Sequence, residues 1–263
     1  MVVNINLAMV EQVRDIALRA GKVIMDIYKT DFTVTAKGDN SPVTEADRLA
    51  DALIVKALRE DVTDRFPIVS EETFEATNPT AVAGTPFWLV DPLDGTREFI
   101  NKRDEFTVNI ALIDAGLPVF GVVHVPALGS TYWGSRNGAF AIEKGGPVHP
   151  IKVRKAPADG LAACVSRSHR SPEEGEFLKP LTIKEEISAG SSLKFCLVAS
   201  GRCDLYPRFG RTMEWDTAAG NAVVRFAGGF VKKIDGGDLT YGKPGFENPH
   251  FIVKGDPLVA NAR

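Results

Sequence analysis

The stretch from Trp88 to Ile100 reads Trp-Leu-Val-Asp-Pro-Leu-Asp-Gly-Thr-Arg-Glu-Phe-Ile, and the rest of the chain is organised around it. Its apolar start, together with Phe87, predicts a short buried strand. Pairing of that strand should stop at Asp91-Pro92, because proline has no N–H to donate to a sheet ladder. Asp94-Gly95-Thr96 then predicts a tight turn that opens a helical turn.

The two aspartates of this stretch, Asp91 and Asp94, are suited to binding a hard cation. Mg²⁺ prefers oxygen ligands, often one or two carboxylates together with water and substrate phosphate. The main-chain carbonyl of Leu93 lies between them and is a further candidate ligand. The amides of Gly95 and Thr96 lie where a helix begins and can point at a phosphate. Asp-Pro and Asp-Gly are also common turn dipeptides, so either dipeptide alone leaves a purely structural role open.

The composition is that of an ordinary globular protein. The chain has 263 residues, enough for one large domain or two subdomains with a sizeable core. A net charge of −3 disfavours a nucleic-acid polymer as partner but not a phosphorylated small molecule, because bound divalent cations reverse the local charge. No apolar run is long enough for a membrane span, and the start of the chain lacks the basic region of a signal peptide.

The cysteines indicate the cellular compartment. There are three, Cys164, Cys196 and Cys203, with no CxxC pair. An odd, small number of this kind predicts reduced, buried thiols in a cytoplasmic protein. Loose association with the inner membrane, and the choice between monomer and homodimer, stay open at this stage.

Apolar spacing divides the first part of the chain into elements. Apolar residues three and four apart predict amphipathic helices over residues 7–28 and 49–58. Thr44 precedes the second helix as a natural N-cap, with Asp47 placed to complete a capping box. A short strand over residues 66–70 ends at the acidic pair Glu71-Glu72. After the central stretch, strand segments at 106–113, 119–125, 131–134 and 139–142 predict an antiparallel meander.

The glycine- and proline-rich segment from 145 to 150 predicts a boundary between subdomains. Residues 1–145 would form an α+β metal-site subdomain and residues 146–263 an α/β substrate-binding subdomain, joined in one compact unit. In the second part, strands alternate with helices, as expected of an α/β half. The predicted strands cover 162–166, 183–188, 204–206 and 230–234, and the predicted helices cover 173–178, 191–200 and 216–227.

The acidic residues are ambiguous one by one. Asp47 fits a helix cap, Glu71 a solvated strand end, and Asp216 an N-cap before Thr217-Ala218-Ala219-Gly220. Their joint order and spacing, with Asp91 and Asp94 between them, is a much more specific pattern.

This pattern resembles the lithium-sensitive, magnesium-dependent phosphomonoesterase superfamily, which includes inositol monophosphatase and fructose-1,6-bisphosphatase. The matching motifs are Glu71-Glu72, Asp91 to Thr96 and Trp215 to Gly220, and the resemblance covers essentially the whole chain. A narrower resemblance is to the bacterial 3′(2′),5′-bisphosphate nucleotidases. It is carried by four strings: Trp88 to Ile100, Glu105 to Ile113, Gly190 to Ala199, and Leu205 to Gly210.

The resemblance implies an α/β fold of alternating helix and sheet layers, an inositol-monophosphatase-like sandwich. It implies two or three Mg²⁺ ions and inhibition by Li⁺. The ligands that it implies are Glu71, Asp91, the Leu93 carbonyl, Asp94 and Asp216. Physical chemistry agrees, because phosphate monoester hydrolysis is extremely slow without a catalyst, and paired cations can neutralise the attacking and leaving oxygens.

In the family pattern a threonine and an aspartate orient the attacking water, and these correspond to Thr96 and Asp47. Glu71 is an alternative base, and the sequence does not decide between them. The amides of Gly95, Thr96 and Arg97 would hold the scissile phosphate, next to Glu71, Asp94 and Asp216. The Arg97 side chain would either add positive charge or form a surface salt bridge.

Substrate selection is expected from the second half of the chain. Lys194 and Arg208 would bind a second phosphate or the ribose, since a bisphosphate needs positive charge away from the metals. Tyr206 would contact the nucleoside or pack in the core. Ser168 and His169, within the basic segment 166–170, form a second phosphate-binding candidate or a plain surface loop.

The expected activity is hydrolysis of the 3′-phosphate of adenosine 3′,5′-bisphosphate to AMP and phosphate. By resemblance it extends to 3′-phosphoadenosine 5′-phosphosulfate, which links it to sulfur assimilation. The alternatives are an inositol monophosphatase or sugar bisphosphatase, and a non-catalytic nucleotide-binding protein.

Overall fold

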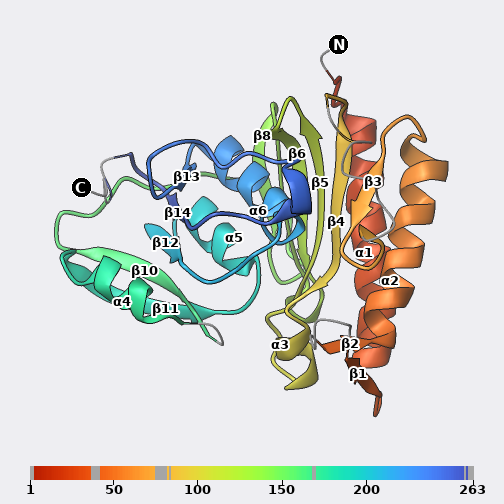
Figure 1. Cartoon of the computed structure of the whole chain (residues 1–263), viewed down its shortest axis with the longest axis horizontal. Helices are drawn as coiled ribbons and strands as arrows, with labels where there is room; N and C mark the ends of the chain where they lie inside the picture. The colour runs from red at the N-terminus through yellow and green to blue at the C-terminus, as the bar shows by residue number, and fades with distance from the viewer. Residues whose placement is uncertain are drawn as a thin grey trace.

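Two large β-sheets, separated by helices, form most of the computed structural model of the chain, and a two-stranded sheet is added to them (Figure 1). The structure describes residues 3–36, 42–74, 82, 84–167, 170–257 and 259. Within these residues the layers are a helix pair, a seven-stranded sheet, a second helix pair, a five-stranded sheet and an outer helix. The predicted layered α/β fold is confirmed.

The larger sheet has the strand order β3-β4-β5-β6-β7-β8-β9. β3 and β4 run parallel, and each later neighbouring pair is antiparallel, which confirms the predicted meander. The sheet continues into β9, so strand pairing crosses residue 145, and the proposed division into subdomains stays a prediction. The strands are β3 (Ile68–Ser70), β4 (Phe87–Asp94), β5 (Thr107–Asp114), β6 (Leu117–Val125), β7 (Ser130–Ser135), β8 (Gly138–Ile142) and β9 (His149–Ile151).

β4 carries the first part of the central stretch and contains a bulge near its end. Asp91 pairs with Asn109 and Asp94 pairs with Thr107, with a shift of register between the two pairs. The prediction that pairing stops at Asp91-Pro92 is therefore wrong. The bulge takes Pro92, which has no N–H, out of the ladder, and pairing resumes at Asp94. Both aspartates are thus fixed at the same end of the strand.

Helices α1 (Leu7–Tyr28) and α2 (Glu45–Ala57) cover the outer face of the larger sheet (Figure 1). α2 begins directly after Thr44, whose hydroxyl accepts a hydrogen bond from the Ala46 amide, while Asp47 accepts one from the Thr44 amide at 2.8 Å. The predicted capping box is therefore present. β1 (Val34–Ala36) pairs with β2 (Pro42–Thr44) before α2, and a π-helical turn (Leu58–Val62) follows it.

The smaller sheet has the order β11-β10-β12-β14-β13, with β10 parallel to β11 and β12 and with β14 antiparallel to its neighbours. The predicted alternation is confirmed, although β14 was not predicted, and α6 begins at Glu214 rather than Asp216. The elements are β10 (Leu161–Ser166), α4 (Pro172–Leu178), β11 (Ile183–Ala189), α5 (Leu193–Ala199), β12 (Leu205–Arg208), α6 (Glu214–Phe226), β13 (Phe230–Lys233) and β14 (Phe251–Lys254). Two 3₁₀ turns cover Pro126–Leu128 and Pro244–Phe246.

Glycines let α6 pack directly on the larger sheet. A Cβ added at Gly121, in β6, would lie 2.7 Å from the Ala219 carbonyl oxygen and 2.8 Å from the Ala219 Cα, both in α6. Gly134, in β7, is as close to Ala222. Since backbone atoms cannot rotate away as a flexible side chain can, this contact sets the distance between the helix and the sheet.

We expect Gly121→Ala to lower the free energy of unfolding by about 1–3 kcal/mol, because overpacking forces the helix away from the sheet. Denaturant unfolding would measure this change. Gly175→Ala is the control, since Gly175 lies in α4 with no heavy atom within 4 Å of an added Cβ. If Gly121→Ala unfolds at the wild-type denaturant concentration, the close contact does not position α6.

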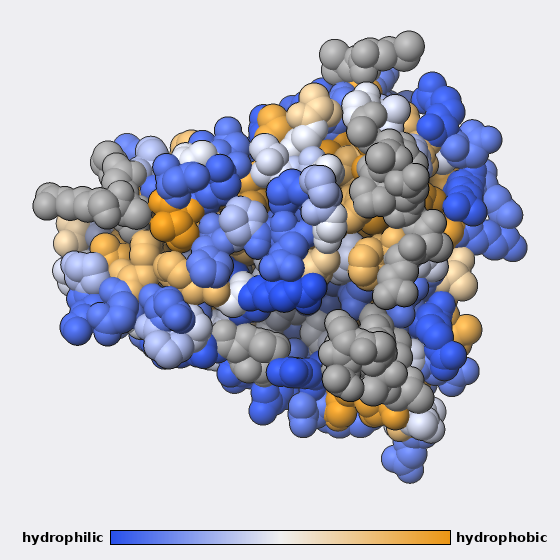
Figure 2. All heavy atoms as spheres, viewed as in Figure 1, coloured by the Kyte–Doolittle hydropathy of each residue, from blue (hydrophilic) through white to orange (hydrophobic). Residues whose placement is uncertain are grey.

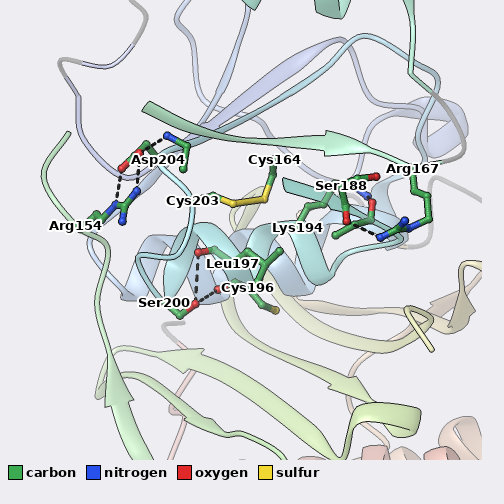
Figure 3. The surroundings of a disulfide bond; sticks show 12 residues. Arg154, Cys164, Arg167, Ser188, Lys194, Cys196, Leu197, Ser200, Cys203 and Asp204 are labelled. Atoms are coloured by element: carbon green, nitrogen blue, oxygen red, sulfur yellow. Dashed lines mark hydrogen bonds and ion pairs between the residues drawn. A yellow bond between two sulfur atoms is a disulfide. The ribbon is translucent and has the colours of Figure 1, made fainter. Parts of the chain in front are cut away.

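The cysteine prediction is wrong for two of the three residues. Cys164, in β10, and Cys203, just before β12, form a disulfide with their Cα atoms 6.0 Å apart (Figure 3). The pair is 39 residues apart in sequence, and parallel pairing of β10 with β12 brings its members together. Cys196, in α5, is a buried free thiol as predicted, and burial raises its pKa.

Hydrophilic residues dominate the face shown in Figure 2, and hydrophobic residues occur there only in small groups. The most exposed large apolar side chains of the described residues, Leu7 and Val148, belong to different parts of the chain. No helix among the described residues is long and apolar enough to cross a membrane.

Candidate functional site

A cavity of about 730 Å³ lies where the end of β4 meets α3 (Thr96–Ile100), the ends of β10 and β11, and the first turns of α5 and α6. The lining residues before residue 145 are mostly acidic, and those after it include several cations. The acidic members are Glu71, Glu72, Asp91, Asp94, Glu98 and Asp216, and the cations are Arg97, Arg167, Lys194, Arg208 and Arg211.

Three of the predicted ligands meet in this cavity. Glu71 directly follows β3, Asp91 lies in β4, and Asp216 lies in the first turn of α6. One carboxylate oxygen of each lies within 4.8 Å of the others. Burial raises the pKa of Asp216, and the nearby charges of Asp94 and Glu71 raise it further. Crowded oxygen ligands that repel one another are a suitable set for a hard divalent cation, which would neutralise their charge.

Asp94 lies beside this cluster but is held by other partners. Its Oδ2 accepts hydrogen bonds from the Ser192 amide at 2.6 Å and from the Thr107 hydroxyl at 3.5 Å. Burial raises the pKa of Asp94 to about 6, although the positive charge of Lys194 opposes that shift. Asp94 is therefore the carboxylate that faces the cationic side of the cavity. Its role as a metal ligand stays a prediction.

Thr96 and Asp47 are in contact, as a water-orienting pair requires. The Thr96 hydroxyl donates to Asp47 Oδ1 at 3.3 Å, and the alternative acceptor is the Leu93 carbonyl at 3.4 Å. The other Asp47 oxygen accepts from the Thr44 amide and hydroxyl at 2.8 and 2.7 Å. Asp47 is buried, and these bonds fix its carboxylate. Thr96 Oγ can still accept a hydrogen bond from a further donor.

Gly95 connects β4 to α3 in a left-handed conformation, with φ +90°. A side chain there would be strained, and its Cβ would lie 3.1 Å from Ser191 Cβ. Gly95, Thr96 and Arg97 all line the cavity beside the carboxylates, and the Arg97 side chain is exposed. The backbone that was predicted to bind phosphate therefore borders the site.

Lys194 is buried on the opposite side of the cavity. Its Nζ donates to the carbonyls of Ser191 and Ala189 at 2.8 and 3.1 Å, and it lies 5.2 Å from the centre of the Tyr206 ring. Burial lowers the pKa of Lys194 to about 8, although the charge of Asp94 opposes that shift. The ammonium group is thus a fixed positive charge inside the site.

Arg208 and Tyr206 come from β12 on the same side. Arg208 Nη1 donates to the Ser166 hydroxyl at 2.9 Å. Tyr206 is buried and packs edge-on against Phe195 and Phe251, although it also lines the cavity. The structure supports packing for Tyr206, one of the two roles left open by the sequence.

Two predicted residues cannot be placed in the site, and two residues near it were not predicted. Ser168 and His169 lie outside the described residues. Sequence reasoning did not single out the buried Glu98, or Ser192, whose hydroxyl donates to Asn109 Oδ1 at 2.7 Å. The Gly190-Ser191-Ser192 string was the available signal, since two hydroxyls just before a helix can bind an anion or a side chain.

The fold and the site together define a layered α/β protein with a carboxylate cluster that could bind a metal. The family model for the inositol monophosphatase family matches residues 7–261. The chain belongs to this family, and the predicted resemblance is confirmed.

Individual relatives and solved structures agree. A protein of Escherichia coli named 3′(2′),5′-bisphosphate nucleotidase CysQ is 44% identical over 93% of this chain and 99% of its own length. One of that name from Aggregatibacter actinomycetemcomitans is 36% identical over 93% of this chain and 92% of its own. The crystal structure of CysQ from Bacteroides thetaiotaomicron has a TM-score of 0.82 and 38% identity, covering 96% of this chain and 99% of that one.

Proposed function

We propose that the protein is a Mg²⁺-dependent phosphomonoesterase that converts adenosine 3′,5′-bisphosphate to AMP and phosphate. The observation that carries the proposal is the division of one cavity into a carboxylate cluster and a separate cationic side with the buried Lys194. A substrate with two phosphates fits such a cavity, one phosphate on each side. The names of the relatives support the same activity. Its nucleotide substrate would place the enzyme in the cytoplasm.

Glu71, Asp91 and Asp216 would hold the metal, with Asp94 and the Leu93 carbonyl as further ligands for a total of two or three ions. All of these are oxygen donors, as Mg²⁺ requires. When bound, Mg²⁺ supplies positive charge to the phosphate in the transition state and lowers the pKa of water.

The residues of the chain would orient the attacking water. The Thr96 hydroxyl donates a hydrogen bond to Asp47. The Thr96 oxygen would therefore accept a hydrogen bond from the water and orient that water toward phosphorus. Asp47 is held for this purpose by two hydrogen bonds from Thr44. Glu71 remains the alternative base.

The backbone of Gly95 to Arg97 would hold the scissile phosphate, and Lys194 and Arg208 would bind the second one. Neither Lys194 nor Arg208 is required by a monophosphate, so charge on that side selects a bisphosphate. 3′-Phosphoadenosine 5′-phosphosulfate carries a similar charge at its 5′ end and is a second expected substrate.

Phosphate release from adenosine 3′,5′-bisphosphate and from inositol 1-phosphate, with and without Mg²⁺, would test the proposal. We expect fast release from the nucleotide only, dependent on Mg²⁺ and inhibited by Li⁺. A preference for inositol phosphate would contradict the nucleotide specificity and leave the metal site in place. Binding without turnover of either compound would indicate a nucleotide-binding protein instead.

A further inference from the structure

Arg167 and Glu105 form a rigid ion pair at the border of the cavity. Arg167 Nε and Nη2 donate to the two Glu105 carboxylate oxygens at 2.7 and 2.8 Å. Nη2 also donates to the Ser188 carbonyl at 2.7 Å, as Figure 3 shows. The Gly190 amide donates to the same carboxylate at 2.8 Å. Glu105, itself held by the Gly190 amide, and the Ser188 carbonyl therefore fix the guanidinium in one plane.

These bonds make Arg167 a poor phosphate ligand. Two of its three nitrogens already donate to protein oxygens, including both bonds of a bidentate fork. The Glu105 carboxylate cancels its charge and would repel a phosphate at the same place. Positive charge for a second phosphate comes instead from Lys194 and Arg208.

The flat face of the guanidinium is what Arg167 can still offer. Arg167 lines the cavity, and its side chain is 36% exposed. A guanidinium whose edge is occupied by a carboxylate stacks well on an aromatic ring, because stacking uses the face and not the N–H groups. Ser166, the residue before Arg167 and the last of β10, accepts a hydrogen bond from Arg208. A base attached to a ribose whose far phosphate is at Arg208 would thus lie close to this face.

We propose that Arg167, held flat by Glu105, stacks on the nucleobase of the substrate and is a specificity-determining residue. The inference rests on the proposed function and adds a base subsite to it. The ligand class is a planar heteroaromatic ring on a phosphorylated ribose. Glu105 is a positioning residue, because it acts by fixing the guanidinium plane.

The test compares two substrates that differ only in the base. Steady-state kinetics would use adenosine 3′,5′-bisphosphate and the base-free methyl riboside 3,5-bisphosphate. Arg167→Met is expected to lower kcat/KM about 5- to 20-fold for the nucleotide, mostly through KM, and to leave the base-free compound unchanged. Glu105→Gln should also lower kcat/KM for the nucleotide, by a smaller factor than Arg167→Met.

Arg170→Met is the matched control. Arg170 also makes a bidentate bond, from Nη1 and Nη2 to Glu186 at 2.8 and 2.9 Å, but it is not among the residues that line the cavity. This variant should match wild type on both substrates.

Two results for Arg167→Met would overturn the stacking role. One is an equal loss of kcat/KM for both substrates, and the other is an unchanged kcat/KM for the nucleotide. A wild-type enzyme that releases phosphate from neither compound would contradict the proposed function instead. Calorimetry would then decide the stacking role by itself, by comparing the Kd of wild type and of Arg167→Met for each of the two compounds.

Discussion

Asp91→Asn should lower kcat by about 10³-fold or more while the protein stays folded. Asp91 is buried at the centre of the predicted metal ligands, and an amide cannot supply the negative charge that holds a hard cation. A loss of about 4 kcal/mol of transition-state stabilisation corresponds to this factor. Phosphate release at saturating substrate and millimolar Mg²⁺ would measure it.

Thermal unfolding would separate a loss of metal from a loss of fold. Asparagine keeps the oxygen that accepts the Leu93 amide, which lies 3.1 Å from Asp91 Oδ1, and it reduces repulsion with Glu71 and Asp216. Without Mg²⁺ the midpoint should therefore equal or exceed that of wild type. The rise in midpoint that Mg²⁺ causes in wild type should disappear, because that rise measures binding to the folded state.

Glu185→Gln is the control for the change of charge, since Glu185 is exposed on β11. It should keep both the wild-type rate and the Mg²⁺-dependent rise. If Asp91→Asn keeps a near-native rate at ordinary Mg²⁺, Asp91 is not an essential ligand.

The acidic side of the site was predictable because its residues mark the ends of recognisable elements. Glu71 follows a short apolar strand, Asp91 follows the apolar run of a longer one, and Asp216 lies in the first turn of a helix of small residues. The structure brings these three carboxylates together, while their role as ligands stays a prediction. The local pattern of each residue would not have placed it in a shared site, since each also fits a helix cap or a solvated strand end. The order and spacing of the acidic residues together predicted that site.

Features that depend on distant contacts could not be predicted. Arg167 and Glu105 are 62 residues apart, and each has the local pattern of a solvated surface charge. Cys164 and Cys203 are paired by the parallel alignment of β10 and β12, which their spacing does not reveal. The bulge at Pro92 was missed for another reason, because the proline rule correctly excludes one ladder position but says nothing about Asp94 beyond it.

Lys194→Met should lower kcat/KM for adenosine 3′,5′-bisphosphate about 10- to 150-fold and leave a nucleoside 3′-monophosphate almost unaffected. A hydrogen bond to a charged group contributes about 1.5–3 kcal/mol, and each 1.36 kcal/mol is a factor of ten. Methionine keeps the length and the apolar stem of the side chain, so the variant removes the ammonium group alone. Steady-state kinetics on the two substrates would measure the ratio.

Stability should not follow activity in this variant. Burial lowers the pKa of Lys194 to about 8, so at neutral pH the protein holds a proton there against the cost of desolvation. Replacing the charge removes that cost and also removes two hydrogen bonds to carbonyls, so the unfolding midpoint should change by only a few degrees. Lys184→Met, at an exposed position of β11, should change neither quantity. Equal losses on the bisphosphate and the monophosphate would mean that Lys194 acts through Asp94 on the carboxylate side, and would remove it from the second phosphate site.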